Sequence, residues 1–241
     1  MLATATLFTA AAILVLGVIV LARARATLVT YLFFAITVGA SGWLGFFALM
    51  YGAASAAHAA VFARVASAFA SILPAATFHF AAAYVSRRRA LRNVILFCWV
   101  FCGAIAFLEL ATPYIVIGVR QFSFGYYPIG SRYNFTWALI FVGMFAAAVR
   151  LLWRAAMTSE GVERKRARAL VVSFAVALLA AVEFLPSLGI DVMPLGFIAI
   201  LAFIAIAAHA IWRYRLVELT PEYAAGQILA TMKGAVIVVD L

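Results

Sequence analysis

Three ionisable side chains interrupt long apolar stretches of this sequence: Arg64, Glu109 and Glu183. A charged group inside a bilayer is expensive, so each is a functional candidate. Counted along their stretches, all three fall near the same membrane face. Two interpretations stay open, and they are not exclusive. Either Arg64 pairs with a carboxylate and holds helices together, since an unpaired buried charge is costly, or the residues line an outward-open pocket that binds a signal.

Polar and aromatic residues at nearly the same depth complete this candidate site. Asp191 and Arg132 lie just beyond it, and Asn134 opens the next apolar stretch. Small-molecule sites usually combine a few polar groups with apolar walls, which four aromatic residues could supply here. The predicted ligand-binding residues are Arg64, Glu109, Glu183, Trp43, Trp137, Asn134, Tyr126, Tyr127, Arg132 and Asp191.

A second candidate site is a possible switch, formed by His79 and Pro74 on the third apolar stretch. Proline inside a helix predicts a kink. The histidine is either a buried, hydrogen-bonded packing residue or a proton-sensitive switch. The other two histidines are scattered, so no metal site is predicted. Cys98 and Cys102 lie four residues apart on one helical face and are expected to pack rather than to form a disulfide.

Catalytic motifs are absent from the sequence. It contains no glycine-rich phosphate loop, no nucleophile motif and no phospho-acceptor histidine box. We therefore predict no catalytic residue and no cofactor in these 241 residues. If the full-length protein is an enzyme, its chemistry lies beyond Leu241.

The elements that must position these residues are membrane helices. The chain is 68% apolar and 11% charged, whereas soluble domains are about 45–50% apolar and about 25% charged. Unpaired backbone groups are not tolerated in lipid, so long apolar runs must be helical. Each run approaches or exceeds the roughly 18 residues that cross hydrocarbon. The predicted fold is an all-α bundle of seven transmembrane helices at 5–22, 28–50, 59–85, 94–112, 134–155, 169–188 and 195–212.

Lysine and arginine set the orientation of the bundle, because cytoplasmic loops carry them in excess. One side holds only Arg64, Arg120 and Arg132, and the other 15 of the 18 basic residues lie on the opposite side. This split predicts an outer N-terminus and an inner C-terminus. The net charge of +10 is then a topology signal, and no nucleic-acid partner is expected.

The connections between helices carry further expectations. No basic residue precedes the first run, so it is predicted to be a retained helix rather than a signal peptide. The outer segment 113–133 either caps the bundle or places its aromatic residues among lipid headgroups. The inner loop 156–168 carries a basic run that is expected to face anionic lipid. Gly39, Gly42 and Gly45 favour close helix packing within the bundle, with a dimer face as the alternative.

The composition changes after Arg215. Thr220-Pro221 is typical of a helix start, apolar residues follow with helical period, and the β-branched run after Gly234 predicts a strand. A lone strand has no partner, so it is expected to begin a further domain. The predicted division is a sensor domain at 1–215, a cytoplasmic linker or signalling helix at 216–234, and the truncated start of a PAS-like domain at 235–241.

Three stretches resemble the N-terminal seven-helix sensor region of bacterial histidine kinases. They are LPAATFHFAAAYVSRRR at 73–89, LGIDVMPLGF at 188–197, and RYRLVELTPEYAAGQILATMKGAVIVVD at 213–240. The resemblance implies a multi-pass protein of the bacterial inner membrane, part of a two-component system. It would relay an extracytoplasmic or membrane signal to PAS and kinase domains. A homodimer through the cytoplasmic domains of the full-length protein is also implied.

Rival functions remain beside this expectation. Related seven-helix modules precede diguanylate cyclase domains, so the output could be a cyclase. A small transporter is a further alternative, although no internal repeat is evident and the charges cluster near one face rather than at the midplane. A retinal protein needs a lysine in its last helix, and 195–212 has none. The expected partners are the lipid bilayer and an unidentified small-molecule or membrane signal.

Overall fold

Seven helices cross the molecule in the computed structural model, which describes residues 1–24 and 26–213. Within those residues, six helices are long and apolar enough to span a membrane, and the seventh is shorter. The seven-helix bundle predicted from the apolar runs is confirmed. The helices are α1 (Leu2–Arg23), α2 (Leu28–Tyr51), α3 (Ala56–Tyr84), α4 (Arg92–Ala111), α5 (Arg132–Thr158), α6 (Gly161–Leu178) and α7 (Gly196–Arg213).

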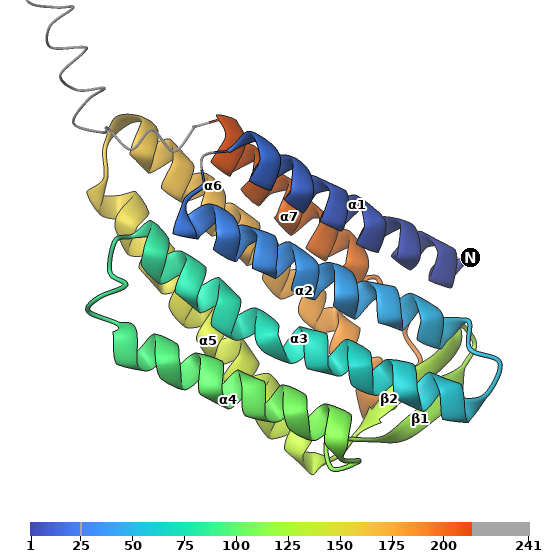
Figure 1. The fold of residues 1–241 in the computed structure, drawn as a ribbon. Coiled ribbons are helices and arrows are strands. Elements are labelled where there is room, and N and C mark those ends of the chain that lie inside the picture. The colour runs from blue at the N-terminus through green and yellow to red at the C-terminus, as the bar shows by residue number, and fades with distance from the viewer. Residues whose placement is uncertain (25, 214–241) are drawn as a thin grey trace, which may run out of the picture.

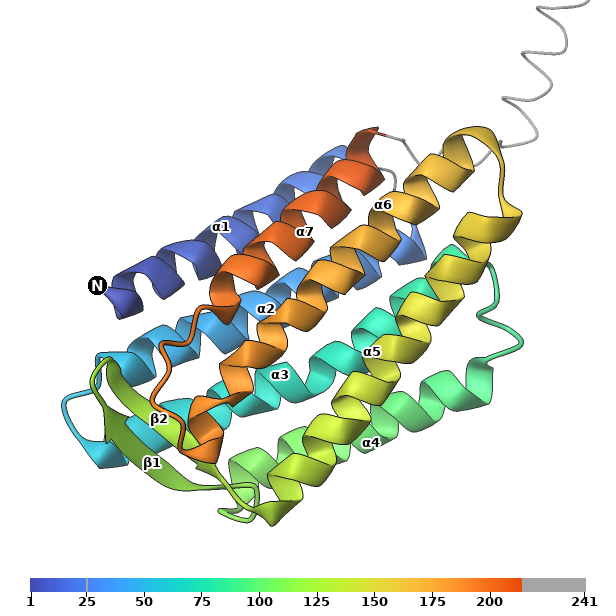
Figure 2. The same cartoon turned by 180° about the vertical axis from the view of Figure 1, so that it is seen from behind.

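The helices form two layers, which Figures 1 and 2 show from opposite sides. One layer runs α1, α2, α3, α4, each helix packed on the next. The other runs α7, α6, α5, with α7 packed on α1 and α5 packed on α3. Helices that follow each other in the chain run antiparallel, so all odd-numbered helices run the same way, and the packed pairs α1–α7 and α3–α5 are parallel. The space between the layers holds the core.

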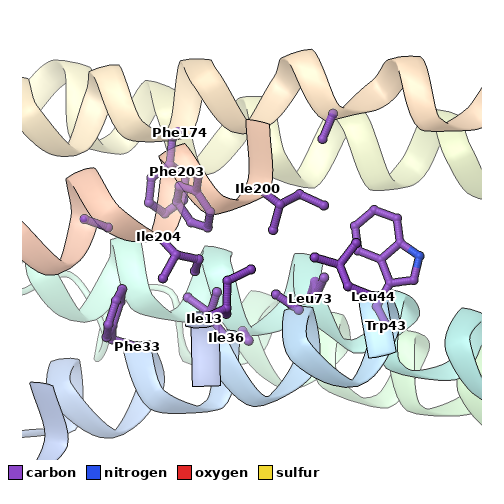
Figure 3. Close-up of a cluster of buried hydrophobic side chains, with 14 of the residues drawn as sticks. Ile13, Phe33, Ile36, Trp43, Leu44, Leu73, Phe174, Ile200, Phe203 and Ile204 are labelled. Atoms are coloured by element: carbon purple, nitrogen blue, oxygen red, sulfur yellow. The ribbon is translucent and has the colours of Figure 1, made fainter. Parts of the chain in front are cut away.

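Large apolar side chains fill that core. Ile36 on α2, Leu73 on α3 and Ile200 on α7 point into the space between the layers, as Figure 3 shows. Phe174 of α6 and Phe203 of α7 pack edge to face, with ring centroids 5.2 Å apart. This core joins the two layers, because its members come from both.

Small residues bring α1, α2 and α3 close together. A Cβ added to Gly42 would lie 2.6 Å from a ring carbon of Phe69 on α3. Ser41 donates a hydrogen bond of 2.8 Å from its hydroxyl to the carbonyl oxygen of Ala10 on α1. Small side chains let membrane helices approach closely. The predicted packing of this glycine-rich face within the bundle is therefore confirmed.

A β-hairpin that the sequence did not predict covers one end of the bundle. Strands β1 (Val116–Phe122) and β2 (Gly125–Gly130) pair antiparallel. Gly125 follows the tight turn with φ +128°, and a Cβ there would lie 3.1 Å from the carbonyl carbon of Tyr51. Glycine alone tolerates this combination of backbone angle and close approach. Of the two expectations for 113–133, capping of the bundle is the one that the structure supports.

The sixth helix departs most from its expected bounds of 169–188. It begins at Gly161, so the predicted inner loop 156–168 is wrong and only Ser159 and Glu160 separate α5 from α6. At its other end it changes into the 3₁₀ segments η1 (Leu179–Phe184) and η2 (Pro186–Leu188). Charged residues can continue a helix beyond the hydrocarbon, which an apolar-run criterion misses.

The hairpin, the N-terminus and η1 lie at one end of the molecule, and the arginine-rich connection between α3 and α4 lies at the other, together with the arginine-bearing end of α5 and start of α6. We call these the outer and inner ends, following the charge distribution. Helix α7 runs from the outer end to the inner end. The predicted linker helix at 216–234 and PAS strand at 235–241 fall outside the described residues.

Candidate functional site

A narrow cavity of about 40 Å³ lies beneath the hairpin. Four of the predicted site residues line it together: Trp43 of α2, Glu109 of α4, Tyr127 of β2 and Trp137 of α5. All four are buried. The structure thus brings side chains from three helices and the hairpin around one space. That this space binds a signal stays a prediction.

Glu109 is the acidic wall of the cavity. Its side chain is only 2% exposed, and its Oε2 accepts a hydrogen bond of 2.8 Å from the hydroxyl of Ser71 on α3. Its other oxygen accepts no hydrogen bond from any residue that the structure describes. Because Glu109 lines the cavity, this oxygen is available to a donor inside it.

Glu183 joins three elements behind the cavity. This carboxyl group is 1% exposed and accepts two hydrogen bonds, one of 3.1 Å from the Tyr51 hydroxyl and one of 2.7 Å from the Gly196 amide. Gly196 is the first residue of α7, and an acidic group at a helix N-terminus is favoured by the helix dipole. Glu183 therefore fastens the outer end of α7 to the end of α2.

Tyr127 extends the same network into the hairpin. Its hydroxyl donates a hydrogen bond to the backbone carbonyl oxygen of Glu183. Burial first, and then the nearby Glu183 carboxyl, raises the pKa of Tyr127 well above its ordinary value, so the hydroxyl stays a donor. The ring packs against Phe47 and Tyr51 of α2, with centroids 5.6 and 6.3 Å away. The hairpin is thereby linked by hydrogen bonds to η1 and, through Glu183, to α7.

Arg64 pairs with neither carboxylate, so the ion-pair interpretation is wrong for the described structure. The side chain is half-buried on α3, and its Nε atom is buried without a hydrogen-bond partner. Glu109 accepts its one hydrogen bond from a serine hydroxyl instead, and Glu183 accepts two from a tyrosine hydroxyl and a backbone amide. Serine and tyrosine hydroxyls in this bundle donate the hydrogen bonds that the guanidinium of Arg64 would have donated to the two carboxyl groups.

Of the other predicted site residues whose side chains the structure describes, Asp191 and Tyr126 do not line the cavity. Asp191 is exposed in the connection before α7. Tyr126 is half-buried beside Tyr127, and alternate residues of a strand point to opposite faces. Arg132 and Asn134 open α5, and their side chains fall outside the described part of the structure.

His79 and Pro74 lie elsewhere, deeper in α3. The Nδ1 atom of His79 accepts a hydrogen bond of 3.3 Å from the indole of Trp99 on α4. This agrees with a hydrogen-bonded packing role, while the switch stays a prediction. The helix continues past Pro74, and the hydroxyl of Thr77 donates to the carbonyl oxygens of Leu73 and Pro74.

Several site residues escaped the sequence analysis. Ser67 lines the cavity and Ser71 bonds Glu109. Their spacing from Arg64, three and seven residues on, places them on the same helical face, and this signal could have found them. Tyr51 and Gly196 carried no comparable signal, because their partner Glu183 is far away in the chain.

Comparison with known proteins gives one family. The model of the family described as the N-terminal 7TM region of histidine kinase matches residues 5–221. A search of curated proteins found no match. The family match covers every described helix apart from the first residues of α1.

Proposed function

The chain belongs to the family of N-terminal 7TM regions of histidine kinases, and we propose that it works as the sensory module of a bacterial two-component kinase. In this proposal it detects an extracytoplasmic or membrane signal at the outer cavity. It then relays the signal through α7 to PAS and kinase domains on the cytoplasmic side of the inner membrane. The multi-pass bundle provides the path across the bilayer.

The observation that carries the proposal is the Glu183 network. Glu183 accepts hydrogen bonds from Tyr51 and Gly196, and its backbone accepts one from Tyr127. The cavity wall and the first turn of α7 are thus tied to one residue, through its backbone and its side chain respectively. If the hairpin has two arrangements, a signal that binds one of them more tightly would also shift the position of α7. The size of this shift is limited by the difference in the affinity of the signal for the two arrangements.

The proposal is tested with the full-length protein in membrane vesicles. Glu183→Gln keeps the size of the side chain but replaces one acceptor oxygen by a donor group. We expect this variant to change autophosphorylation and to lose its regulation. Asp191→Asn is the matched control, because Asp191 is an exposed carboxylate in the same outer region, and it should behave as wild type.

Three results would contradict the proposal. Autophosphorylation of Glu183→Gln identical to that of wild type, in the basal and the stimulated state, would exclude a relay through this residue. Synthesis of a cyclic dinucleotide by the full-length protein would identify a cyclase output, and flux of a solute through the bundle would identify a transporter.

A further inference from the structure

The outer cavity adjoins a second cavity between the two helix layers. The second one has a volume of about 50 Å³, and Trp43, Phe141 and Phe184 line both. Because three side chains line both cavities, the two cavities adjoin each other, and together they make up one candidate binding space with an outer and an inner part. Its outer part lies beneath the hairpin, and its inner part reaches the core residues Ile200 and Phe203 of α7, which Figure 3 labels.

The two parts of this space differ in chemistry. The outer part carries Glu109 and the hydroxyl groups of Ser67 and Ser187. The inner part is lined by aliphatic and aromatic side chains, with Thr77 as its single hydroxyl. That hydroxyl already donates to backbone carbonyl oxygens of its own helix. The outer part is therefore the more polar of the two, and the inner part is apolar.

The inner part also reaches the lipid-facing surface. Val142 of α5 and Leu178 of α6 line it, and their side chains are 42% and 36% exposed. Leu178 is the last residue of α6 before the change to the 3₁₀ segment η1. The rim of the cavity thus lies between α5 and α6, where a molecule dissolved in the bilayer could enter from the side.

We propose that this space binds a single-chain amphiphile from the bilayer, with its alkyl chain in the inner part and a hydrogen-bond-donating head group, a hydroxyl or an amine, at Glu109. Volumes of about 50 and about 40 Å³ leave room for only a few water-sized groups each, so a linear chain fits better than a ring, and the part of the chain far from the head group extends between α5 and α6 into the bilayer. The donor is required because the second carboxyl oxygen of Glu109 has no partner among the described residues. This deepens the proposed function and rests on it, since the amphiphile would be the signal.

The test uses the full chain in lipid nanodiscs and three photoreactive probes with a diazirine on the chain: a long-chain alcohol, the matching amine and the matching carboxylic acid. The alcohol and the amine should label cavity residues saturably, and the acid should bind about tenfold more weakly, equivalent to about 1.4 kcal/mol, because it brings a like charge to Glu109. Glu109→Gln keeps an acceptor oxygen but removes the charge, so it should reduce labelling by the amine and spare labelling by the alcohol.

Two alanines of α6 provide the matched variants. Ala177 lines the inner part, whereas Ala175 is exposed on the outside of the same helix. Ala177→Phe should reduce saturable labelling about tenfold, equivalent to about 1.4 kcal/mol, and Ala175→Phe should leave it unchanged. Unlabelled alcohol should also reduce photolabelling of the wild-type protein, and this competition tests for a saturable site without any variant.

Labelling that never saturates, or that Ala177→Phe and Ala175→Phe affect equally, would overturn the proposal. Equal binding of the carboxylic acid would overturn its head-group assignment. The labelling result does not depend on the kinase output. Saturable binding of the amphiphile without any change in autophosphorylation contradicts the proposed function. Regulated autophosphorylation without such binding contradicts only this inference.

Discussion

Removal of the Glu183 carboxyl group is predicted to destabilise the bundle more than removal of any exposed carboxylate. Glu183→Ala leaves the Tyr51 hydroxyl and the Gly196 amide without their acceptor. An orphaned buried donor costs about 1–3 kcal/mol. Hydrogen bonds between membrane helices measured in pairs are weaker, about 0.6 kcal/mol on average, because the unfolded chain in the bilayer finds other partners. Two donors lose their acceptor, and we take the lower cost of about 1 kcal/mol for each. The free energy of unfolding should therefore fall by about 2 kcal/mol.

The assay is equilibrium unfolding of the purified chain in mixed micelles, followed by circular dichroism. Asp191→Ala is the matched control and should change the free energy of unfolding by less than about 0.5 kcal/mol, because exposed substitutions rarely do more. Tyr51→Phe combined with Glu183→Ala completes a double-mutant cycle, and the two changes should couple by about 0.5 kcal/mol or more. Equal losses for the two alanine variants, or strict additivity in the cycle, would refute the network.

Two further predictions concern packing and topology. Gly42→Ala places a Cβ 2.6 Å from the ring of Phe69 and should destabilise the bundle by about 1–3 kcal/mol in the same unfolding assay, whereas Gly103→Ala meets no atom within 4 Å and should be neutral. A cysteine at Ser123, at the hairpin tip, should react with a membrane-impermeant maleimide on intact cells, whereas one at Thr158 should react only after permeabilisation; the reverse pattern would contradict the orientation deduced from charge.

The helices were predictable because the bilayer leaves few alternatives. A run of about 20 apolar residues must be helical in lipid, so the spans follow from composition alone. Their ends were less predictable where charged residues continue a helix into water. Arg164 and Arg168 lie within α6 although they were expected in a loop.

The hairpin was missed for a different reason. Its turn residues Ser123 and Phe124 lack the Asn-Gly or Asp-Gly pattern that marks a tight hairpin. Its strands are short and sit among aromatic residues that are equally typical of a membrane interface. The strand signal was therefore hidden in a segment expected to lie at the bilayer surface.

Part of the candidate site could be predicted from the sequence. Depth along each helix placed Trp43, Glu109 and Trp137 at one level, and the structure puts them around one cavity. Rotation about each helix axis was not predictable for isolated spans, so the sequence could not decide whether Arg64 pairs with Glu109 or Glu183, and the described structure contains neither pair. Hydroxyl groups can satisfy a buried carboxyl as a cation can, and the sequence gives no preference between them.

The central claim, that Glu183 ties the outer cap to α7, is tested most directly by the distance between the inner ends of α1 and α7. Spin labels at Ala22 and His209, both exposed, report this distance by double electron–electron resonance in a chain whose two native cysteines are replaced by alanine. We predict that Glu183→Gln shifts or broadens the distance distribution and that Asp191→Asn leaves it unchanged. Superimposable distributions for wild type and Glu183→Gln would contradict the account.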